Sequence, residues 1–229
     1  MKIKVSSFVF GWLCQADSWF YKYVEPINRK YCEIYGYEYV VDNYNEHPEW
    51  VSDRDNDRSS IWYKVGHIKR NLKDCDYLLY LDADAIFYPS ALDIETEILP
   101  YLPQHKSIYI GHDVMGVGGY YYVVGTLVNS GVILFRNDAV SHEFLTEWDN
   151  ITDIPEYNKL KHEWPLDQTG FDILRQDARF VEAIHLEPFT MRLQGHCGRF
   201  IRHLAGPGWD YKAEVFKEIN EIWSKRTVK

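Results

Sequence analysis

The sequence predicts an α/β fold in which helices cover both faces of a right-handed parallel sheet, all within a single domain. The first half alternates short β-rich runs with helical patterns, which is typical of a sheet covered by helices. Residues 77–81 form an uninterrupted apolar run, as expected of a strand buried on both faces. The 229 residues are 46% hydrophobic and 26% charged, a composition that suits one sizeable core.

The elements of the first half follow from the spacing of apolar residues and from the residues that typically begin or end a helix. The sequence predicts a strand at 2–10, a helix at 27–36, a strand at 37–41, a helix at 59–74 and a strand at 76–84. Gly36 stands at the usual C-terminal capping position of the first helix, and Ser59 or Ser60 is the expected N-cap of the second. The very polar residues 52–60 predict a surface loop.

The second half is less regular. Strands are predicted at 107–113 and 131–138, and helices at 141–150, 165–177 and 213–223. The Gly- and Tyr-rich residues 115–125 are expected to lie between strands, as a flap over a site.

Charge and composition exclude several classes of partner. The net charge of −9 argues against binding to nucleic acid or to anionic lipid. The apolar N-terminal stretch is too short to span a membrane and lacks a signal-peptide cleavage pattern. We therefore expect a soluble, cytoplasmic or otherwise intracellular protein without signal peptide or membrane anchor. Its four cysteines have no metal-type or disulfide-type spacing, which indicates free thiols.

Two carboxylates end the most buried segment of the sequence. Asp82 and Asp84 follow the apolar run with one residue between them. Ligands of open α/β sheets bind at the carboxyl ends of strands, and residues i and i+2 of an extended chain point to the same side. Two such carboxylates repel each other unless a cation lies between them, and oxygen ligands suit Mg²⁺ or Mn²⁺. The pattern therefore predicts a metal site that binds a diphosphate. The alternative is a pair of solvated loop residues.

The order of four stretches resembles a known family. These stretches are "YLLYLDADAIFYP", "TLVNSGVILFRND", "WPLDQTGFDIL" and "GRFIRHLAG", preceded by "WYK" at 62–64. The set resembles the α-galactosyl- and α-xylosyltransferases of the GT-A fold and covers about residues 35–206. The resemblance implies a Rossmann-like mixed central sheet flanked by helices. The resemblance implies a glycosyltransferase that moves a hexose or pentose from a nucleotide sugar, UDP-linked, to a glycan hydroxyl with retention of configuration. About residues 1–90 would bind the nucleotide and about 91–229 the acceptor.

The resemblance also implies a metal ligand set. Asp84 would bind the metal directly, Asp82 would contact the ribose and the metal shell, and His203 would supply the remaining ligand. An imidazole ligand favours Mn²⁺ over Mg²⁺. Alternatively, His203 is a packed histidine between its apolar neighbours, and His196 is a rival ligand. The chain departs from the family after this point, because the expected lysine near the diphosphate is replaced by a displaced Lys212.

Donor contacts are expected from two other segments. Lys64 falls on the apolar stripe of its helix, so its ammonium group either extends to the surface or reaches a phosphate. The resemblance adds a donor-binding group that comprises Ala83, Asn129, Ser130 and Gly131. For residues 129–131, the alternative is a simple turn into the next strand.

Catalytic and acceptor roles are implied for a later group. Asp167 and Gln168 begin a helix, where a carboxylate is also a natural capping group. The resemblance places this pair beside the transferred sugar, Asp167 orienting hydroxyls and Gln168 supporting developing positive charge. Expected acceptor-binding residues are His112, Asp113 and Trp164.

The sequence is also compatible with two other functions. "YLDADAI" also resembles the motif of haloacid-dehalogenase-type phosphohydrolases, in which the first aspartate is the nucleophile, although that motif normally follows the first strand. The third interpretation is a catalytically silent carbohydrate-binding protein.

Overall fold

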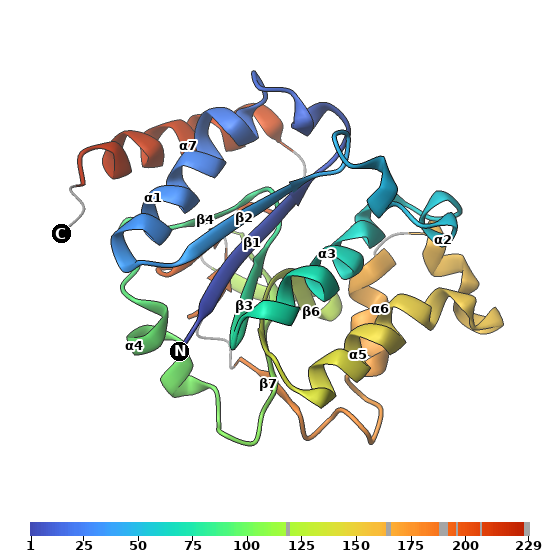
Figure 1. Cartoon of the computed structure of the whole chain (residues 1–229). Coiled ribbons are helices and arrows are strands. Elements are labelled where there is room, and N and C mark those ends of the chain that lie inside the picture. The colour runs from blue at the N-terminus through green and yellow to red at the C-terminus, as the bar shows by residue number, and fades with distance from the viewer. Residues whose placement is uncertain (118–119, 164–165, 188–191, 196, 207, 227–229) are drawn as a thin grey trace.

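The computed structural model of the chain describes residues 1–117, 120–163, 166–187, 192–195, 197–206 and 208–226. Its centre is a six-stranded sheet in the order β2-β1-β3-β6-β5-β7 (Figure 1). These strands are β1 (Ile3–Val9), β2 (Glu38–Asn43), β3 (Tyr77–Leu81), β5 (Ile108–Val117), β6 (Tyr120–Arg136) and β7 (Ile184–Leu186). The first three are parallel, and β6 runs antiparallel to both β3 and β5. The predicted mixed sheet is therefore confirmed.

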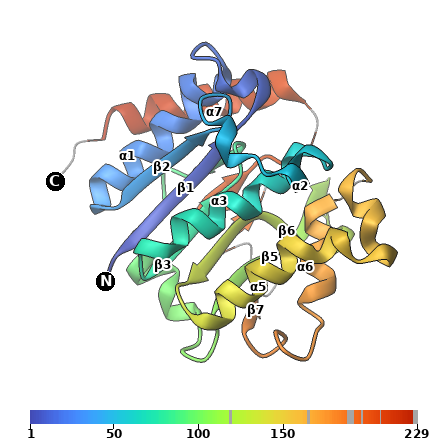
Figure 2. The ribbon, with the colours of Figure 1, turned by 45° about the vertical axis from the view of Figure 1, so that its right-hand side comes forward.

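Helices cover both faces of this sheet (Figures 1 and 2). The α-helices are α1 (Glu25–Tyr35), α2 (Asp53–Asn56), α3 (Tyr63–Asn71), α4 (Ile94–Glu97), α5 (Ala139–Asn150), α6 (Leu166–Leu174) and α7 (Trp209–Ser224). Helices α1 and α7 lie together on one face, whereas α3, α5 and α6 cover the other. Gly36 ends α1 with φ of 75°, a left-handed conformation that favours glycine, as predicted.

Strand β3 separates two apolar cores. Leu79 and Leu81 pack on the α1 and α7 side, and Leu78 and Tyr80 pack on the α3, α5 and α6 side. Alternate side chains of a strand point to opposite faces, so an uninterrupted apolar sequence fills both cores. The end of β3 is held rigidly between them.

A second, three-stranded sheet lies beside the end of β3. It has the order β4-β9-β8 and consists of β4 (Ala85–Phe87), β9 (Ile201–His203) and β8 (Gln194–Gly195). The buried side chain of Asn28 in α1 fixes β4, because its amide donates to the Ala85 carbonyl and accepts from the Phe87 N–H. This sheet returns the late part of the chain to the residues that follow β3.

Several predicted boundaries are wrong. Residues 52–60 are not only loop, since they contain α2. The second predicted helix begins as a 3₁₀ turn at Ser60–Trp62, and its N-cap Ser59 makes no side-chain capping hydrogen bond. Residues 115–117 and 120–125 belong to β5 and β6 rather than to a segment between strands. The short strands β4, β7, β8 and β9 are not among the predicted elements.

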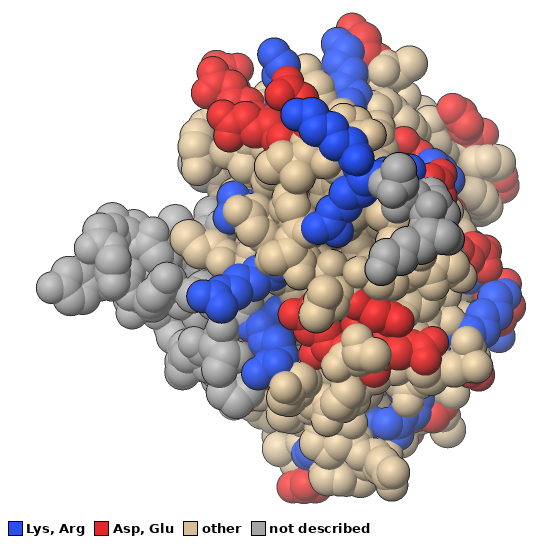
Figure 3. All heavy atoms as spheres, turned by 90° about the vertical axis from the view of Figure 1, so that its left-hand side faces the viewer, with Lys and Arg blue, Asp and Glu red and all other residues tan. Residues whose placement is uncertain are grey.

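Acidic and basic groups share the surface. Figure 3 shows one face on which Asp and Glu gather near the middle, with Lys and Arg around them. All four cysteines are free thiols, as expected. Among the described helices, none combines the length and the apolar character that crossing a bilayer requires.

Candidate active site

The two aspartates lie on a turn rather than on extended chain. Strand β3 ends at Leu81, and β4 begins at Ala85. The Ala85 N–H closes the turn by donating to the Asp82 carbonyl at 3.0 Å, and the Asp82 N–H donates to the Gly131 carbonyl at 2.7 Å. The predicted position at a strand end is confirmed, but the extended geometry assumed for the pair is wrong. The turn also contains Ala83, which is half-buried.

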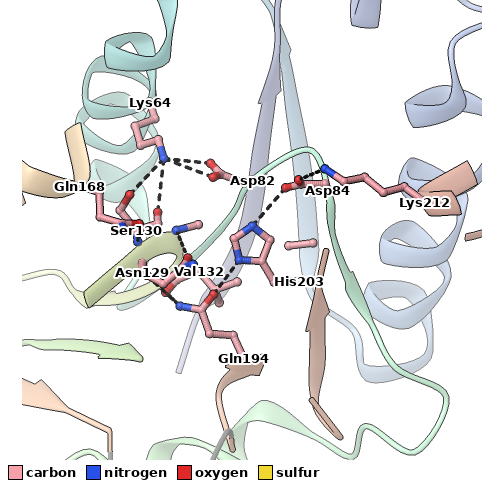
Figure 4. A network of polar contacts seen from close by, with 12 residues as sticks. Lys64, Asp82, Asp84, Asn129, Ser130, Val132, Gln168, Gln194, His203 and Lys212 are labelled. Atoms are coloured by element: carbon pink, nitrogen blue, oxygen red, sulfur yellow. Dashed lines mark hydrogen bonds and ion pairs between the residues drawn. The ribbon is translucent and has the colours of Figure 1, made fainter. Parts of the chain in front are cut away.

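The small sheet brings His203 to Asp84. Strand β9 pairs antiparallel with β4, and this register sets His203 opposite Ala85. The Leu204 N–H donates to the Asp84 carbonyl at 3.0 Å. Nε2 of His203 then lies 3.1 Å from Oδ1 of Asp84 (Figure 4). The histidine is buried, yet polar groups meet both of its ring nitrogens, so it is not merely packed between apolar neighbours.

Asp82, Asp84 and His203 fit a divalent cation. One ligand atom from each lies within 4.8 Å of the other two. Neighbouring ligand atoms around an octahedral ion are about 3 Å apart when the ligand distances are about 2.0–2.1 Å, which agrees with the separation of Asp84 and His203. Two carboxylates and one imidazole suit Mn²⁺ or Mg²⁺. The rival His196 and the predicted acceptor residue Trp164 lie outside the described residues.

Gly131 leaves the space that His203 occupies. A Cβ atom built on Gly131 would lie 2.0 Å from Cε1 and 2.6 Å from Nε2 of the imidazole. Its backbone carbonyl also holds Asp82. The glycine predicted to contact the donor therefore has an additional, steric role in admitting the histidine.

A methyl group at this position is expected to displace the imidazole. Gly131→Ala should weaken Mn²⁺ binding by more than about 10-fold, the lower range for losing a metal-site partner. Isothermal titration of Mn²⁺ measures this, with Gly66→Ala as the matched control, because a Cβ on Gly66 meets its nearest atom at an ordinary 3.6 Å. Equal Mn²⁺ affinity of the two variants would contradict the expected displacement.

Lys64 places a buried cation beside Asp82. Its Nζ lies 3.1 Å from Asp82 Oδ1 and 3.0 Å from Asp167 Oδ2, and it contacts Ser130 at 3.4 Å. Burial lowers the pKa of Lys64, but the carboxylates of Asp167 and Asp82 outweigh burial and hold the pKa above its ordinary value. The side chain is 4% exposed, so the interpretation in which it extends to the surface is wrong.

Lys212 places a second buried cation beside Asp84. Its Nζ lies 2.8 Å from Asp84 Oδ2 and approaches the turn from the side opposite to Lys64 (Figure 4). Burial raises the pKa of Asp84, but His203 and Lys212 outweigh it and hold the pKa well below its usual range. The displacement of this lysine in sequence thus does not remove it from the site. Lys212 lies on the same buried stripe of α7 as Phe216 and Trp223. A lysine on an apolar helical stripe is the sequence pattern that could have predicted its position in the site.

The remaining predicted residues form one network on the other side of Asp82. Ser130 donates from Oγ to Asp167 at 2.7 Å and from its backbone N–H to Gln168 Oε1 at 3.2 Å. Asp113 accepts from Gln168 Nε2 at 3.0 Å and from Asn129 Nδ2 at 3.2 Å. Residues from β5, β6 and α6 thereby meet beside Lys64.

Asp113 lies at an irregularity in the pairing of β5 with β6. The register shifts between His112, which pairs with Val128, and Val114, which pairs with Val123, so the extra residues belong to β6. Asp167 is buried in the first turn of α6, where its carboxylate meets Lys64 rather than simply capping the helix.

Comparisons with known proteins concern the fold. No protein-family model matches the chain, and no curated protein matches it by sequence. A glycosyltransferase involved in the glycosylation of the major capsid of PBCV-1 has a TM-score of 0.64 and 14% identity, over 96% of this chain and 100% of that one. The glycosyltransferase GlyE of Streptococcus pneumoniae TIGR4 has a TM-score of 0.59 and 15% identity, over 98% of this chain and 63% of that one.

A third solved structure holds sugar analogues. The galactosyltransferase LgtC, in complex with donor and acceptor sugar analogues, has a TM-score of 0.52 and 11% identity, over 99% of this chain and 97% of that one. The three alignments each extend over nearly all of the chain. The chain therefore has the α/β fold of GT-A type, with a mixed central sheet flanked by helices, as the sequence predicts.

Proposed function

We propose that this chain is a glycosyltransferase that moves a sugar from a nucleotide donor, UDP-linked, to a hydroxyl of a glycan, with Mn²⁺ as its preferred metal and Mg²⁺ as an alternative. The observation that carries the proposal is the convergence of Asp82, Asp84 and His203 at the carboxyl end of β3. The buried cations Lys64 and Lys212 adjoin this group on its two sides. An anionic diphosphate beside such a group would meet positive charge despite the acidic composition of the chain.

Different residues of the site would bind the metal, contact the diphosphate and position other side chains. Asp82, Asp84 and His203 would hold the cation, which when bound neutralises charge on the diphosphate and assists its departure. Lys212 is positioned to share Asp84 and to meet a diphosphate oxygen. Asp167 acts through Lys64, because both side chains are buried against each other.

The network on the other side of Asp82 would receive the transferred sugar. Asn129 and Ser130 would orient the donor, and Gln168 with Asp113 would face the sugar and the acceptor hydroxyl. An amide is a poor nucleophile, so a covalent intermediate on Gln168 is disfavoured. The family resemblance implies retention of configuration, and without a covalent intermediate this would require attack on the face that the diphosphate leaves, with a phosphate oxygen of the leaving group accepting the proton of the acceptor. His112 and Trp164 remain proposed acceptor contacts.

A cavity near the carboxyl ends of β1 and β2 suits the nucleoside. It has a volume of about 340 Å³. One of its lining residues, Tyr63, directly precedes Lys64 in the chain. Its lining residues include the half-buried Phe10 and Tyr63, and the buried Tyr44, whose ring stacks on that of Tyr63. Aromatic faces bind bases by stacking, so this cavity supports the assignment of the first 90 residues to the nucleotide.

A panel of UDP-linked hexoses and pentoses tests the proposed function. We expect release of UDP from at least one of them, dependent on Mn²⁺ and abolished by a chelator. Hydrolysis of a simple phosphomonoester without UDP release would instead indicate a haloacid-dehalogenase-type phosphohydrolase. Binding of glycans without turnover of any donor would indicate a silent carbohydrate-binding protein, and either outcome overturns the proposal.

A further inference from the structure

We propose that Gln194 is a positioning residue that fixes the tautomer and the ring orientation of His203. The inference rests on the proposed metal site and extends it to a residue of β8 that the sequence did not single out. Gln194 and His203 are 4% and 5% exposed, respectively, so their polar atoms depend on one another and on nearby backbone.

The backbone of β6 determines how the Gln194 amide is oriented. Its Nε2 lies 2.8 Å from the carbonyl oxygen of Asn129 and 3.2 Å from that of Val132. Both partners are acceptors, so the NH₂ end must face them. The amide oxygen Oε1 is thereby directed at His203, with 2.9 Å between it and Nδ1 (Figure 4).

This orientation fixes the tautomer of the histidine. An amide oxygen can only accept a hydrogen bond, so Nδ1 of His203 must carry a hydrogen. Nε2 faces Asp84 at 3.1 Å, where it can donate to the carboxylate when no metal is bound. With Nδ1 held protonated, Nε2 is the ring nitrogen that can lose its hydrogen and bind a metal through its lone pair. A ring held at Nδ1 also needs less reordering when the ion binds.

Two glycines on adjacent strands keep space for this pair of side chains. A Cβ on Gly111 of β5 would lie 3.1 Å from Cγ of Gln194, and a Cβ on Gly131 of β6 would overlap the His203 ring. The sheet is therefore shaped around both side chains. Simple filling of space would need neither the double anchoring of Nε2 nor an acceptor at Nδ1.

Nuclear magnetic resonance of the metal-free, unaltered chain tests the tautomer directly. Long-range ¹H–¹⁵N correlations of the histidine rings, assigned to His203 by comparison with His203→Asn, report whether Nδ1 is protonated. We expect a protonated Nδ1 and an unprotonated Nε2 in the neutral form of the ring. An unprotonated Nδ1 overturns the inference, and because this measurement requires no metal it remains decisive if the metal part of the proposed function fails.

The Mn²⁺ affinity of Gln194 variants tests whether this orientation of His203 strengthens metal binding. Gln194→Leu, which keeps the approximate size but removes the acceptor, should weaken Mn²⁺ binding by about 10- to 100-fold. Gln194→Glu keeps an acceptor at Nδ1 but loses the NH₂ contacts with Asn129 and Val132, so it should bind Mn²⁺ more tightly than Gln194→Leu, which lacks both, and less tightly than the unaltered chain. The exposed Gln176→Leu is the matched control and should bind as the unaltered chain does.

The outcomes separate the inference from the proposed function. Unchanged affinity in Gln194→Leu, or equal loss in the Leu and Glu variants, overturns the positioning role while leaving the metal site intact. Absence of Mn²⁺ binding in the unaltered chain overturns the metal site instead. Mn²⁺ electron paramagnetic resonance, which reports free ion independently of sugar transfer, provides the readout.

Discussion

Asp84→Asn is expected to weaken Mn²⁺ binding and manganese-dependent UDP release by more than about 100-fold, beyond the range for losing an outer-shell partner. The asparagine keeps the shape of the side chain but lacks the negative charge. The carboxylate accepts contacts from both His203 and Lys212, whose influence holds its pKa well below the usual range. It is therefore an anion when folded at neutral pH, and its charge is what a divalent cation would require.

The same substitution is also expected to reduce stability, so the two effects must be measured separately. Lys212 is buried and would lose its charged partner, a change that is strongly destabilising in general. Titration with Mn²⁺ and UDP release should be compared at a temperature where denaturation curves show the variant folded. Asp210→Asn, at an exposed position of α7, is the matched control. A folded Asp84→Asn protein with unchanged Mn²⁺ affinity would exclude Asp84 as a ligand.

Local sequence patterns predicted the part of the site that depends on one strand. The apolar run of β3 is buried on both faces, and its end could be located because two aspartates follow it directly. The helix that carries Lys64 was likewise predicted from its periodicity. These features depend on contacts near in sequence, where strand and helix periods are readable.

The rest of the site depends on pairing between distant segments. Strands β8 and β9 contain two and three residues, too few for a periodic signal, yet their register places Gln194 and His203. Asp113 lies where the register of β5 against β6 shifts because β6 contributes extra residues, and no local sequence pattern predicts that shift. His203 entered the sequence prediction only through the resemblance.

Both buried lysines are charged residues at apolar positions of a helix, which is a detectable signal. The sequence prediction used this signal for Lys64 only. Each lies on the apolar stripe of its helix and places its ammonium group on a carboxylate that follows β3. The family pattern predicts a lysine at another position, and Lys212 is displaced from it in sequence. A charged residue at an apolar helical position is a physical anomaly in any family, and in this fold it twice marks the same site.

Lys64→Met is expected to lower the free energy of unfolding by about 3–5 kcal/mol, the typical cost of removing one partner of a buried ion pair. The Lys64 and Asp167 side chains are only 4% and 5% exposed, so the remaining carboxylate would be buried without its cation. Chemical denaturation measures the loss. Lys69→Met on the same helix is the matched control, because Lys69 is 35% exposed and pairs with Asp149. Exposed pairs contribute about 1 kcal/mol or less.

A double variant separates the buried ion pair from the packing of the lysine side chain. If the destabilisation comes from the uncompensated carboxylate, Lys64→Met with Asp167→Asn should be more stable than Lys64→Met alone, because the second change removes the buried charge. A double variant whose losses simply add would place the cost in packing. Restored stability without restored UDP release would then indicate that the pair serves the reaction as well as the fold, since the neutral side chains still fill the space beside Asp82.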